Sequence, residues 1–182
     1  ADREVTVSGG ASGDVTLTAD AVIIATGSVP RTIPGFEVDG TTVVTSDEFL
    51  SLDTLPERAA VIGGGAIGCE FASTLADMGA EVTVLEALPK ILPGCDEDVT
   101  KAVERSFRKR KIAIRTGVAV DGHEPKPEGG TTLRLGDETL DVDLVVVSVG
   151  RSPYTEGLGL DAAGVKTDER GFVVIDSACR TD

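Results

Sequence analysis

Apolar residues in the middle of the chain change from a continuous run to a helical spacing and back. The run at 59–62 is wholly apolar and predicts a buried strand. A glycine-rich turn follows, then apolar residues at helical spacing from Cys69 to Ala76, then a second apolar strand at 81–85. This succession predicts a βαβ unit and therefore an α/β fold with parallel strands.

Further strands are predicted on both sides of this unit. Before it, short extended segments occupy 4–7 and 15–18, the second with the alternation of a half-buried strand, and a continuous apolar run at 21–25 predicts a buried strand. After it, strands are predicted at 112–115, 118–124, 131–135, 139–140, 143–149 and 172–175. Glycine and proline turns separate the segments between 118 and 140, which therefore predict an antiparallel meander.

Two additional helices are indicated by their ends. Ser46 is the predicted N-cap of a helix with Asp47 and Glu48 in its first turn, and Phe49, Leu50 and Leu52 would supply its apolar face. A second helix is predicted from the acids at 96–98 to about Lys111. Three acids can bind a divalent metal, but they more often cap a helix, and we favour capping. The cations at 105–111 are interpreted as a solvated helix end.

The glycine-rich turn, GGGAIG at 63–68, carries the main chemical signal. In a dinucleotide site Gly63 permits the tight turn, Gly65 lets a pyrophosphate approach the backbone, and Gly68 lets the helix pack close to the sheet. Glu86 ends the next strand, eighteen residues after Gly68, where a carboxylate can accept hydrogen bonds from a ribose. The alternative is a structural turn whose glycines serve packing alone.

Composition excludes several classes of function. The 182 residues suffice for one large domain or two small ones, and the formal net charge of −14 would repel nucleic acid and anionic membranes. Aromatic residues make up only 3% of the chain, which disfavours a base-stacking surface. No apolar run approaches the ~20 residues of a membrane span, and the N-terminal segment does not resemble a signal peptide.

The three cysteines and the single histidine give no catalytic or metal-binding pattern. Cys69, Cys95 and Cys179 are far apart and match neither CxxC nor zinc spacing. Cys69 is interpreted as a small buried residue of the central helix, and the absence of a disulfide framework favours a reducing, cytoplasmic location. His123 is predicted to be a surface residue without a direct role.

Four stretches together resemble one enzyme family: DAVIIATGSVP at 20–30, IGGGAIGCEF at 62–71, DLVVVSVGRSP at 143–153 and TEGLGLDAAGV at 155–165. They are similar to the flavoprotein disulfide reductases, and the last stretch is typical of the dihydrolipoamide dehydrogenase branch. The resemblance implies a Rossmann-like FAD/NAD(P)-binding fold, a parallel sheet with an antiparallel β-meander. It implies partial FAD-domain segments at 1–40 and 151–182 and an NAD-binding domain at 41–150.

The resemblance also implies which residues bind cofactors. Those around the pyrophosphate and nicotinamide of NAD would be Gly63, Gly64, Gly65, Ala66, Ile67, Gly68, Cys69 and Glu70. Glu86 would bind the adenosine ribose, Val118 the adenine, and Gly150 would lie near the nicotinamide. Thr26, Gly27 and Ser28 would lie against FAD. In the family pattern the Glu70 carboxylate pairs with a lysine near the redox disulfide; the alternative is an ordinary acid favoured by the helix dipole.

The implied enzyme oxidises dihydrolipoamide through a redox disulfide and FAD and reduces NAD to NADH. It would be a homodimer that works with the other components of 2-oxoacid dehydrogenase complexes. The family's FAD glycine motif, its CxxxxC pair and its catalytic His-Glu pair do not occur in this chain. We therefore expect an inactive fragment that binds NAD, retains no FAD and contains no catalytic residue.

Other functions remain open from the sequence alone. The chain is also compatible with an NAD(P)H-dependent disulfide or mercuric reductase of the same family, or with a free-standing nucleotide-binding module. Glu86 favours NAD over NADP, because a carboxylate there repels a 2′-phosphate and neither Ala87 nor Leu88 can receive one. Lys90 is the only nearby cation.

Overall fold

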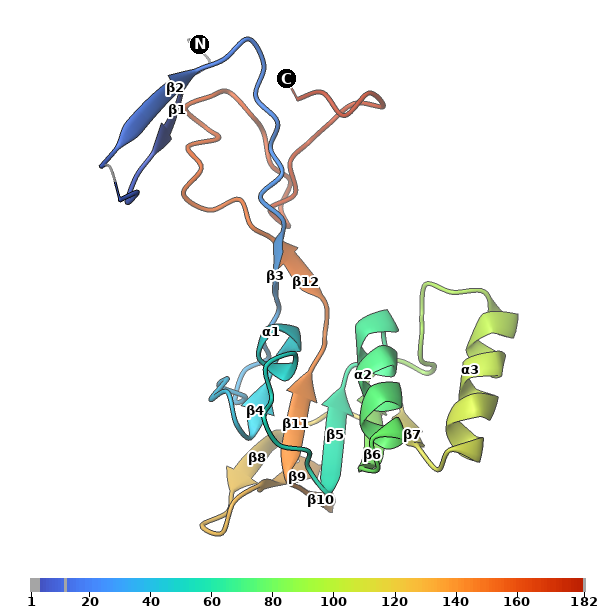
Figure 1. Cartoon of the computed structure of the whole chain (residues 1–182). Coiled ribbons are helices and arrows are strands. Elements are labelled where there is room, and N and C mark those ends of the chain that lie inside the picture. Colours follow the sequence, from blue (N-terminus) through green and yellow to red (C-terminus); the bar gives the residue numbers. More distant parts are fainter. Residues whose placement is uncertain (1–3, 12, 182) are drawn as a thin grey trace. The chain divides into compact units, whose positions relative to one another are not determined.

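The computed structural model describes residues 4–11 and 13–181, and the chain divides into two compact units (Figure 1). The first unit contains the residues up to Val29 and those from Ser152 onward; the second unit is Pro30–Arg151. Residues 30–40 therefore belong to the second unit.

A five-stranded parallel sheet forms the centre of the second unit, with the strand order β4-β11-β5-β6-β7. The strands are β4 (Val43–Val44), β5 (Arg58–Ile62), β6 (Glu81–Glu86), β7 (Ala113–Thr116) and β11 (Leu144–Val147). Their nearly continuous Val, Ile, Ala and Leu content is typical of strands that are covered on both faces. The predictions of strands near 59–62, 81–85, 112–115 and 143–149 are confirmed within a few residues.

The alternation of side chains along these strands builds two separate hydrophobic clusters. Val61, Val84 and Val146 belong to the cluster that contains the helix residues Ala72 and Phe107. Their sequence neighbours Ile62, Leu85 and Val147 belong to the other cluster, together with residues of the antiparallel meander. Since successive residues of a strand point to opposite faces, helices cover one face of the sheet and the meander covers the other.

The meander consists of β8 (Gly122–Pro125), β9 (Thr131–Leu135) and β10 (Glu138–Val142) in the order β10-β9-β8. Its existence is confirmed, but β8 is shorter than the predicted 118–124. His123 is not the surface residue we expected: it is half-buried, its ring stacks on Phe36 at 4.9 Å, and its Nδ1 lies 2.9 Å from Thr131 Oγ1.

The helices are α1 (Ser46–Phe49), α2 (Ala66–Asp77) and α3 (Glu97–Lys109). Thr45, not Ser46, is the N-cap of α1, where it forms a capping box with Glu48. Leu50 is 79% exposed, so its prediction as part of the apolar face is wrong. At α3 the predicted capping by acids is confirmed, because the Asp96 carboxylate accepts a hydrogen bond from the N–H of Asp98.

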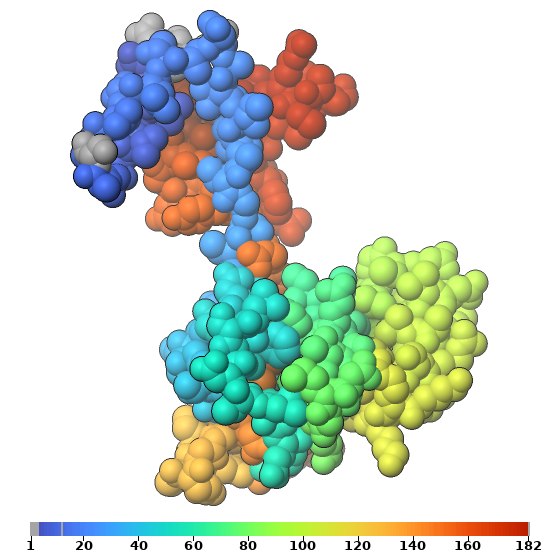
Figure 2. All heavy atoms as spheres, viewed as in Figure 1, coloured from blue at the N-terminus to red at the C-terminus, as the bar shows by residue number. Residues whose placement is uncertain are grey.

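Helices α2 and α3 are joined by one arginine at the end of α3. Figure 2 shows the two helices, green and yellow-green, next to each other on the surface. Arg110 donates hydrogen bonds to the hydroxyl and carbonyl oxygens of Ser73, at 2.9 and 2.6 Å, and forms an ion pair with Asp77 at 2.8 Å. The basic run is therefore not uniformly solvated, and Arg110 fixes the C-terminal half of α2 against α3.

The first unit contains a hairpin of β1 (Glu4–Val7) and β2 (Val15–Thr18). Strand β3 (Ser28–Pro30) pairs with β12 (Arg151–Pro153) where the chain passes between the units. Three predictions for this unit are wrong. The residues of β2 are all exposed, and residues 21–25 form no strand, with Ile23 87% exposed. Residues 172–175 contribute only a single bridge between Thr167 and Val173. An apolar run forms a buried strand only where a further layer covers it, and in the described part of this unit these runs stay exposed.

The described residues contain neither a membrane-spanning helix nor a metal-binding cluster of side chains. Nowhere in these residues does a helix combine the length and apolar character that a bilayer span requires. Within the same ranges, no group of three or more Asp, Glu, His or Cys side chains is arranged to hold a metal ion.

Replacement of Arg110 by alanine is expected to lower the free energy of unfolding of the second unit by roughly 1.5–3 kcal/mol, the usual contribution of hydrogen bonds to a charged group. Urea denaturation followed by circular dichroism measures this change. Arg108→Ala, an exposed position in the same turn, is the matched control and should alter stability by no more than about 0.5 kcal/mol. Equal effects of the two substitutions would contradict the role of Arg110.

Candidate functional site

The register of the parallel sheet brings the predicted site residues to one edge. Val147 is paired with Ile62, Ile62 with Leu85, and Glu86 with Thr116. The residues that leave these strands at their carboxyl ends therefore lie side by side, and they include Gly63, Glu86 and Gly150. The order of the strands reverses between β5 and β11, and ligands of open α/β sheets bind at such switch points.

Three glycines of the turn have no room for a side chain. A Cβ atom at Gly68 would lie 1.9 Å from the carbonyl oxygen of Gly63, and one at Gly63 would lie 2.4 Å from the carbonyl oxygen of Ser148. Gly63 also has a φ of +106°, which disfavours any other residue. A Cβ atom at Gly64 would lie 2.7 Å from Cγ2 of Ile91. Because these three glycines have no side chains, α2 can begin directly behind β5.

Gly65 differs from its neighbours because the space beside it is open. A Cβ atom there would meet nothing within 4 Å. Gly65 is the N-cap of α2, and no side chain caps this helix, whereas α1 and α3 are each capped by a side chain. The first N–H groups of α2 and the positive end of its dipole therefore face a space that an anionic group such as a pyrophosphate fits. Ala66 and Ile67 form the first turn at this end.

Glu86 ends β6 as a buried carboxylate, only 8% exposed. Its Oε2 accepts a hydrogen bond from the N–H of Gly64 at 2.7 Å, and its Oε1 accepts one from the N–H of Leu88 at 2.8 Å. A carboxylate has about four lone-pair positions, so it can still accept bonds from two hydroxyl groups. The prediction that Glu86 ends the second strand is confirmed, but the sequence did not reveal these two backbone bonds.

The exit of β7 completes this side of the site. The N–H of Gly117 donates to the carbonyl oxygen of Leu88 at 3.0 Å, and the N–H of Val118 donates to that of Glu86 at 3.1 Å. These bonds tie the segment after β7 to the segment after β6. Val118 thus lies close to Glu86, as a residue beside the adenine would have to.

Cys69 is buried in the first half of α2, as predicted, and its thiol donates a weak hydrogen bond to the carbonyl oxygen of Gly64 at 3.5 Å. Burial, and then the negative charge of Glu86 and the nearby Cys95 and Glu70, raise the pKa of the Cys69 thiol from 9.0 to about 11. The thiol is therefore neutral at physiological pH and chemically inert.

The remaining predicted residues lie at the edges of this cluster. Glu70 is exposed and is the fifth residue of α2, beyond the first turn, so the dipole alternative explains it poorly. Gly150 has a φ of +110°, and its carbonyl oxygen accepts a hydrogen bond from the N–H of Arg31 at 2.9 Å.

Of the three residues assigned to FAD, Thr26 and Gly27 directly precede β3, and Ser28 is its first residue. The Thr26 hydroxyl donates to the carbonyl oxygen of Tyr154 at 2.6 Å, and the N–H of Tyr154 donates to that of Gly27 at 3.0 Å. Gly27 has a φ of +76° and open space at the position of a Cβ atom, and Ser28 is exposed. The two bonds attach the segment at 26–27 to Tyr154.

Sequence reasoning missed the residues that support the turn from behind. The Ser148 hydroxyl donates to the carbonyl oxygens of Ile62 and Gly63 at 3.2 and 3.1 Å. Ile91 and Leu92, in the loop after β6, are buried against the turn. Two adjacent large apolar residues in this loop were the one signal that the sequence offered.

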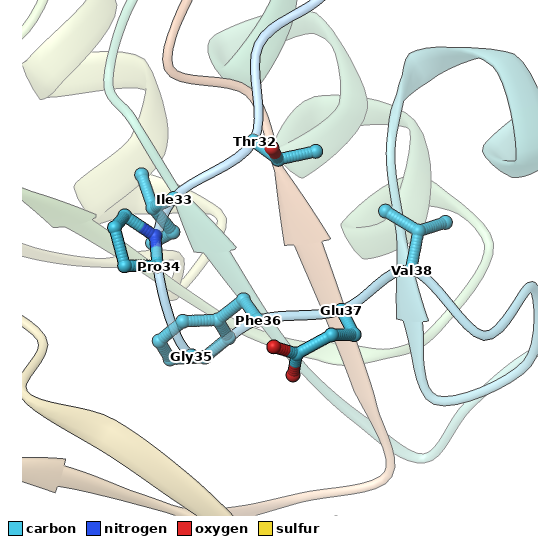
Figure 3. Close-up of a pocket in the computed structure, with 7 residues that line it drawn as sticks. All are labelled: Thr32, Ile33, Pro34, Gly35, Phe36, Glu37 and Val38. Carbon is cyan, nitrogen blue, oxygen red and sulfur yellow. The ribbon is translucent and has the colours of Figure 1, made fainter.

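A hollow of about 550 Å³ lies elsewhere in the second unit (Figure 3). All its lining residues come from the single segment 32–38, and none belongs to the glycine turn. Thr32 and Glu37 are the only polar side chains among them. The hollow therefore offers no converging set of polar groups from different elements, and we assign no ligand to it.

A parallel sheet with a glycine turn, an uncapped helix behind it and an acid at the end of the next strand is the Rossmann-type dinucleotide-binding fold. Comparison with family models agrees: the model described as pyridine nucleotide-disulphide oxidoreductase matches residues 1–182. The chain belongs to this family of oxidoreductases, whose members use FAD and a pyridine nucleotide.

Curated relatives of the chain include dihydrolipoyl dehydrogenases. The chain is 42% identical over 175 residues to the dihydrolipoamide dehydrogenase of Chaetomium thermophilum, with 93% of this chain and 35% of the relative covered. It is 41% identical over 191 residues to the dihydrolipoyl dehydrogenase of Chlorobaculum tepidum, with 98% and 40% covered. The chain thus spans little more than a third of the length of these relatives.

Solved structures give the same family. The Cu(II) complex of an HOCl-induced flavoprotein disulfide reductase from Escherichia coli matches with a TM-score of 0.88 and 29% identity, over 99% of this chain and 41% of that one. An FAD-dependent pyridine nucleotide-disulphide oxidoreductase from Desulfovibrio vulgaris matches with a TM-score of 0.79 and 31% identity, over 99% and 48%.

Alanine substitutions should separate the tight glycine from the open one. Gly68→Ala is expected to destabilise the second unit by about 3 kcal/mol or more, because its Cβ atom would overlap the backbone of Gly63. Gly65→Ala has a compatible φ of −72° and open space, so its stability should stay within about 1 kcal/mol of the parent chain. Thermal unfolding measures both, and a Gly65→Ala variant as unstable as Gly68→Ala would contradict this geometry.

The three thiols should differ in reactivity. Because a pKa near 11 lowers the thiolate fraction at pH 8 roughly 100-fold relative to a pKa of 9, Cys69 should resist iodoacetamide in the folded protein. Cys95 and Cys179 are exposed and should be alkylated. Since folding raises the Cys69 pKa, the folded state should also lose stability as the pH rises from 9 toward 11. Peptide mass mapping checks the labelling, with urea-unfolded protein as the control in which all three react. Labelling of Cys69 as fast as that of Cys95 in the folded protein would contradict the predicted protection of Cys69.

Proposed function

We propose that the second unit is the NAD(H)-binding domain of a flavoprotein disulfide reductase of the dihydrolipoamide dehydrogenase type. One observation carries the proposal: the buried Glu86 carboxylate, the open face of Gly65 and the uncapped start of α2 lie together at one edge of the sheet. This edge supplies a ribose acceptor beside a pyrophosphate site. The names of the curated relatives favour the dihydrolipoamide branch over other disulfide reductases or mercuric reductases.

Each part of the nucleotide has a residue suited to it. The adenosine ribose would donate hydrogen bonds to Glu86, and the adenine would lie against Val118. The pyrophosphate would lie beside Gly65 and accept hydrogen bonds from the first N–H groups of α2. The nicotinamide would extend toward Glu70 and Gly150, and the Glu70 carboxylate would face the junction with the flavin.

The first unit would contribute part of the FAD domain. The backbone at Thr26, Gly27 and Ser28 would form one side of that site. Support comes from the apolar residues that this unit exposes, because such residues are normally covered in a complete domain. They include Val5, Val7, Val15, Leu17, Val22, Ile23, Phe172, Val174 and Ile175.

The chemistry of the whole enzyme would be the oxidation of dihydrolipoamide with transfer of electrons to NAD. The flavin and the nicotinamide supply the electron transfer when bound; the residues of this chain bind and orient the nicotinamide nucleotide and exclude water from it. The fragment itself would be inactive, because its three cysteines provide no CxxxxC pair. A homodimer that serves 2-oxoacid dehydrogenase complexes, in a reducing compartment such as the cytoplasm, completes the proposal.

Glu86 should determine both affinity and the choice of cofactor. Glu86→Ala is expected to weaken NADH binding roughly 10- to 100-fold, since hydrogen bonds to a charged group contribute ~1.5–3 kcal/mol. The parent chain should bind NADH more tightly than NADPH, because a 2′-phosphate would meet the carboxylate. Isothermal titration calorimetry of the purified chain with each nucleotide measures these affinities.

Two further variants control this experiment. Glu81→Ala removes an exposed acid from the opposite end of β6 and should leave NADH affinity unchanged. Gly65→Ala should fold but bind NADH poorly, because its methyl group occupies the pyrophosphate space. Tighter binding of NADPH than NADH, or an unchanged affinity in Glu86→Ala, would refute the assignment. Absence of any binding would favour the alternative that the glycines serve packing alone.

A further inference from the structure

The loop between β6 and α3, residues 87–95, comes back to the glycine turn. Most of the loop is exposed, but Ile91 and Leu92 are 0% and 8% exposed. The N–H of Leu92 donates to the carbonyl oxygen of Gly64 at 2.7 Å, whereas the Cys69 thiol donates to the same oxygen at 3.5 Å. The two buried residues therefore attach the loop to the turn.

Leu92 adopts an unfavourable backbone conformation to make this bond. Its φ is +50°, in the left-handed region that a leucine rarely occupies. The carbonyl oxygen of Leu92 accepts a hydrogen bond from the N–H of Cys95 at 2.9 Å, so both sides of the residue are held. Such strain persists only where the surroundings enforce it, and it is concentrated at functional sites.

Gly64 is consequently held on every side. Its N–H donates to Glu86, its carbonyl oxygen accepts bonds from Leu92 and Cys69, and Ile91 packs where a side chain would be. None of these four partners lies within the turn itself. The flanking Gly63 and Gly65 are the residues that direct the backbone toward the pyrophosphate space, so their orientation depends on how Gly64 is held.

We propose that Ile91 and Leu92 are positioning residues for dinucleotide binding, which act by locking Gly64. This inference rests on the proposed function of the edge as an NAD site. The lock orients the first N–H groups of α2 toward the pyrophosphate before the ligand arrives, which reduces the ordering that binding requires. Glu86 would contact the ribose, whereas Ile91 and Leu92 would act mainly on ligands that carry a pyrophosphate.

The first experiment is a pair of substitutions at the Gly64–Ile91 contact. Gly64 has a φ that other residues tolerate, so Gly64→Ala perturbs the turn through its contact with Ile91. We expect NADH affinity to fall roughly tenfold or more in Gly64→Ala and to recover partly in Gly64→Ala/Ile91→Ala, which removes the Cγ2 atom that the methyl group would meet at 2.7 Å. Parent-like affinity in the single variant, or no recovery in the double variant, would overturn the proposal.

A second pair of variants tests Leu92 if Gly64→Ala fails to fold. Leu92→Pro and Leu92→Gly both lose the leucine side chain, but only proline removes the N–H group and forbids a positive φ. Leu92→Gly is therefore expected to bind NADH at least about ten times more tightly than Leu92→Pro. Similar affinities in two folded variants would overturn the role of the backbone bond.

A ligand series separates positioning from a general loosening of the site. Titrations followed by amide NMR signals would compare NADH and ADP-ribose, which contain a pyrophosphate, with adenosine, which does not. A positioning role predicts equal losses for NADH and ADP-ribose and a much smaller loss for adenosine; equal losses for all three would refute it. If the parent chain binds neither pyrophosphate ligand, the proposed function itself fails, whereas parent binding with unaffected variants refutes only the lock.

Discussion

The close approach of α2 to the end of β5 is the contact on which the rest of the second unit depends. The helix begins behind the strand only because Gly68 has no side chain to meet the carbonyl oxygen of Gly63. Once the helix starts there, its apolar side covers the sheet and its free N–H groups face the carboxyl edge. One steric condition thus produces both the packing of the domain and its anion-binding geometry.

The supports of the turn come from two sides of the sheet. On the β11 side, Ser148 contacts Gly63 through its hydroxyl and its backbone. On the β6 side, Glu86 and the loop that carries Leu92 hold Gly64. Only Gly65 is left open. Contacts therefore hold Gly63 and Gly64, while Gly65 stays open to a ligand, which is the arrangement expected of a preorganised site.

Glu86 has two roles in the proposed site, a binding role and a structural one. Its position at the end of the second strand predicts a ribose acceptor, and its two backbone bonds make it part of the turn's own structure. A carboxylate has enough acceptor positions for both tasks. In the proposed site, the residue that would select the nucleotide also helps to hold the turn that would receive its pyrophosphate.

The sequence by itself determined the βαβ unit, the meander and the place of the glycine turn, because local periodicity and glycine spacing report them directly. It misjudged residues 21–25 and His123, whose burial depends on what lies next to them. The tertiary structure alone decided the roles of Ser148, Leu92 and Arg110. Ser148 and Gly63 are 85 residues apart, and Arg110 and Ser73 are 37 apart. Contacts between such distant positions leave no periodic signal, since they arise only when the sheet sets the strands side by side.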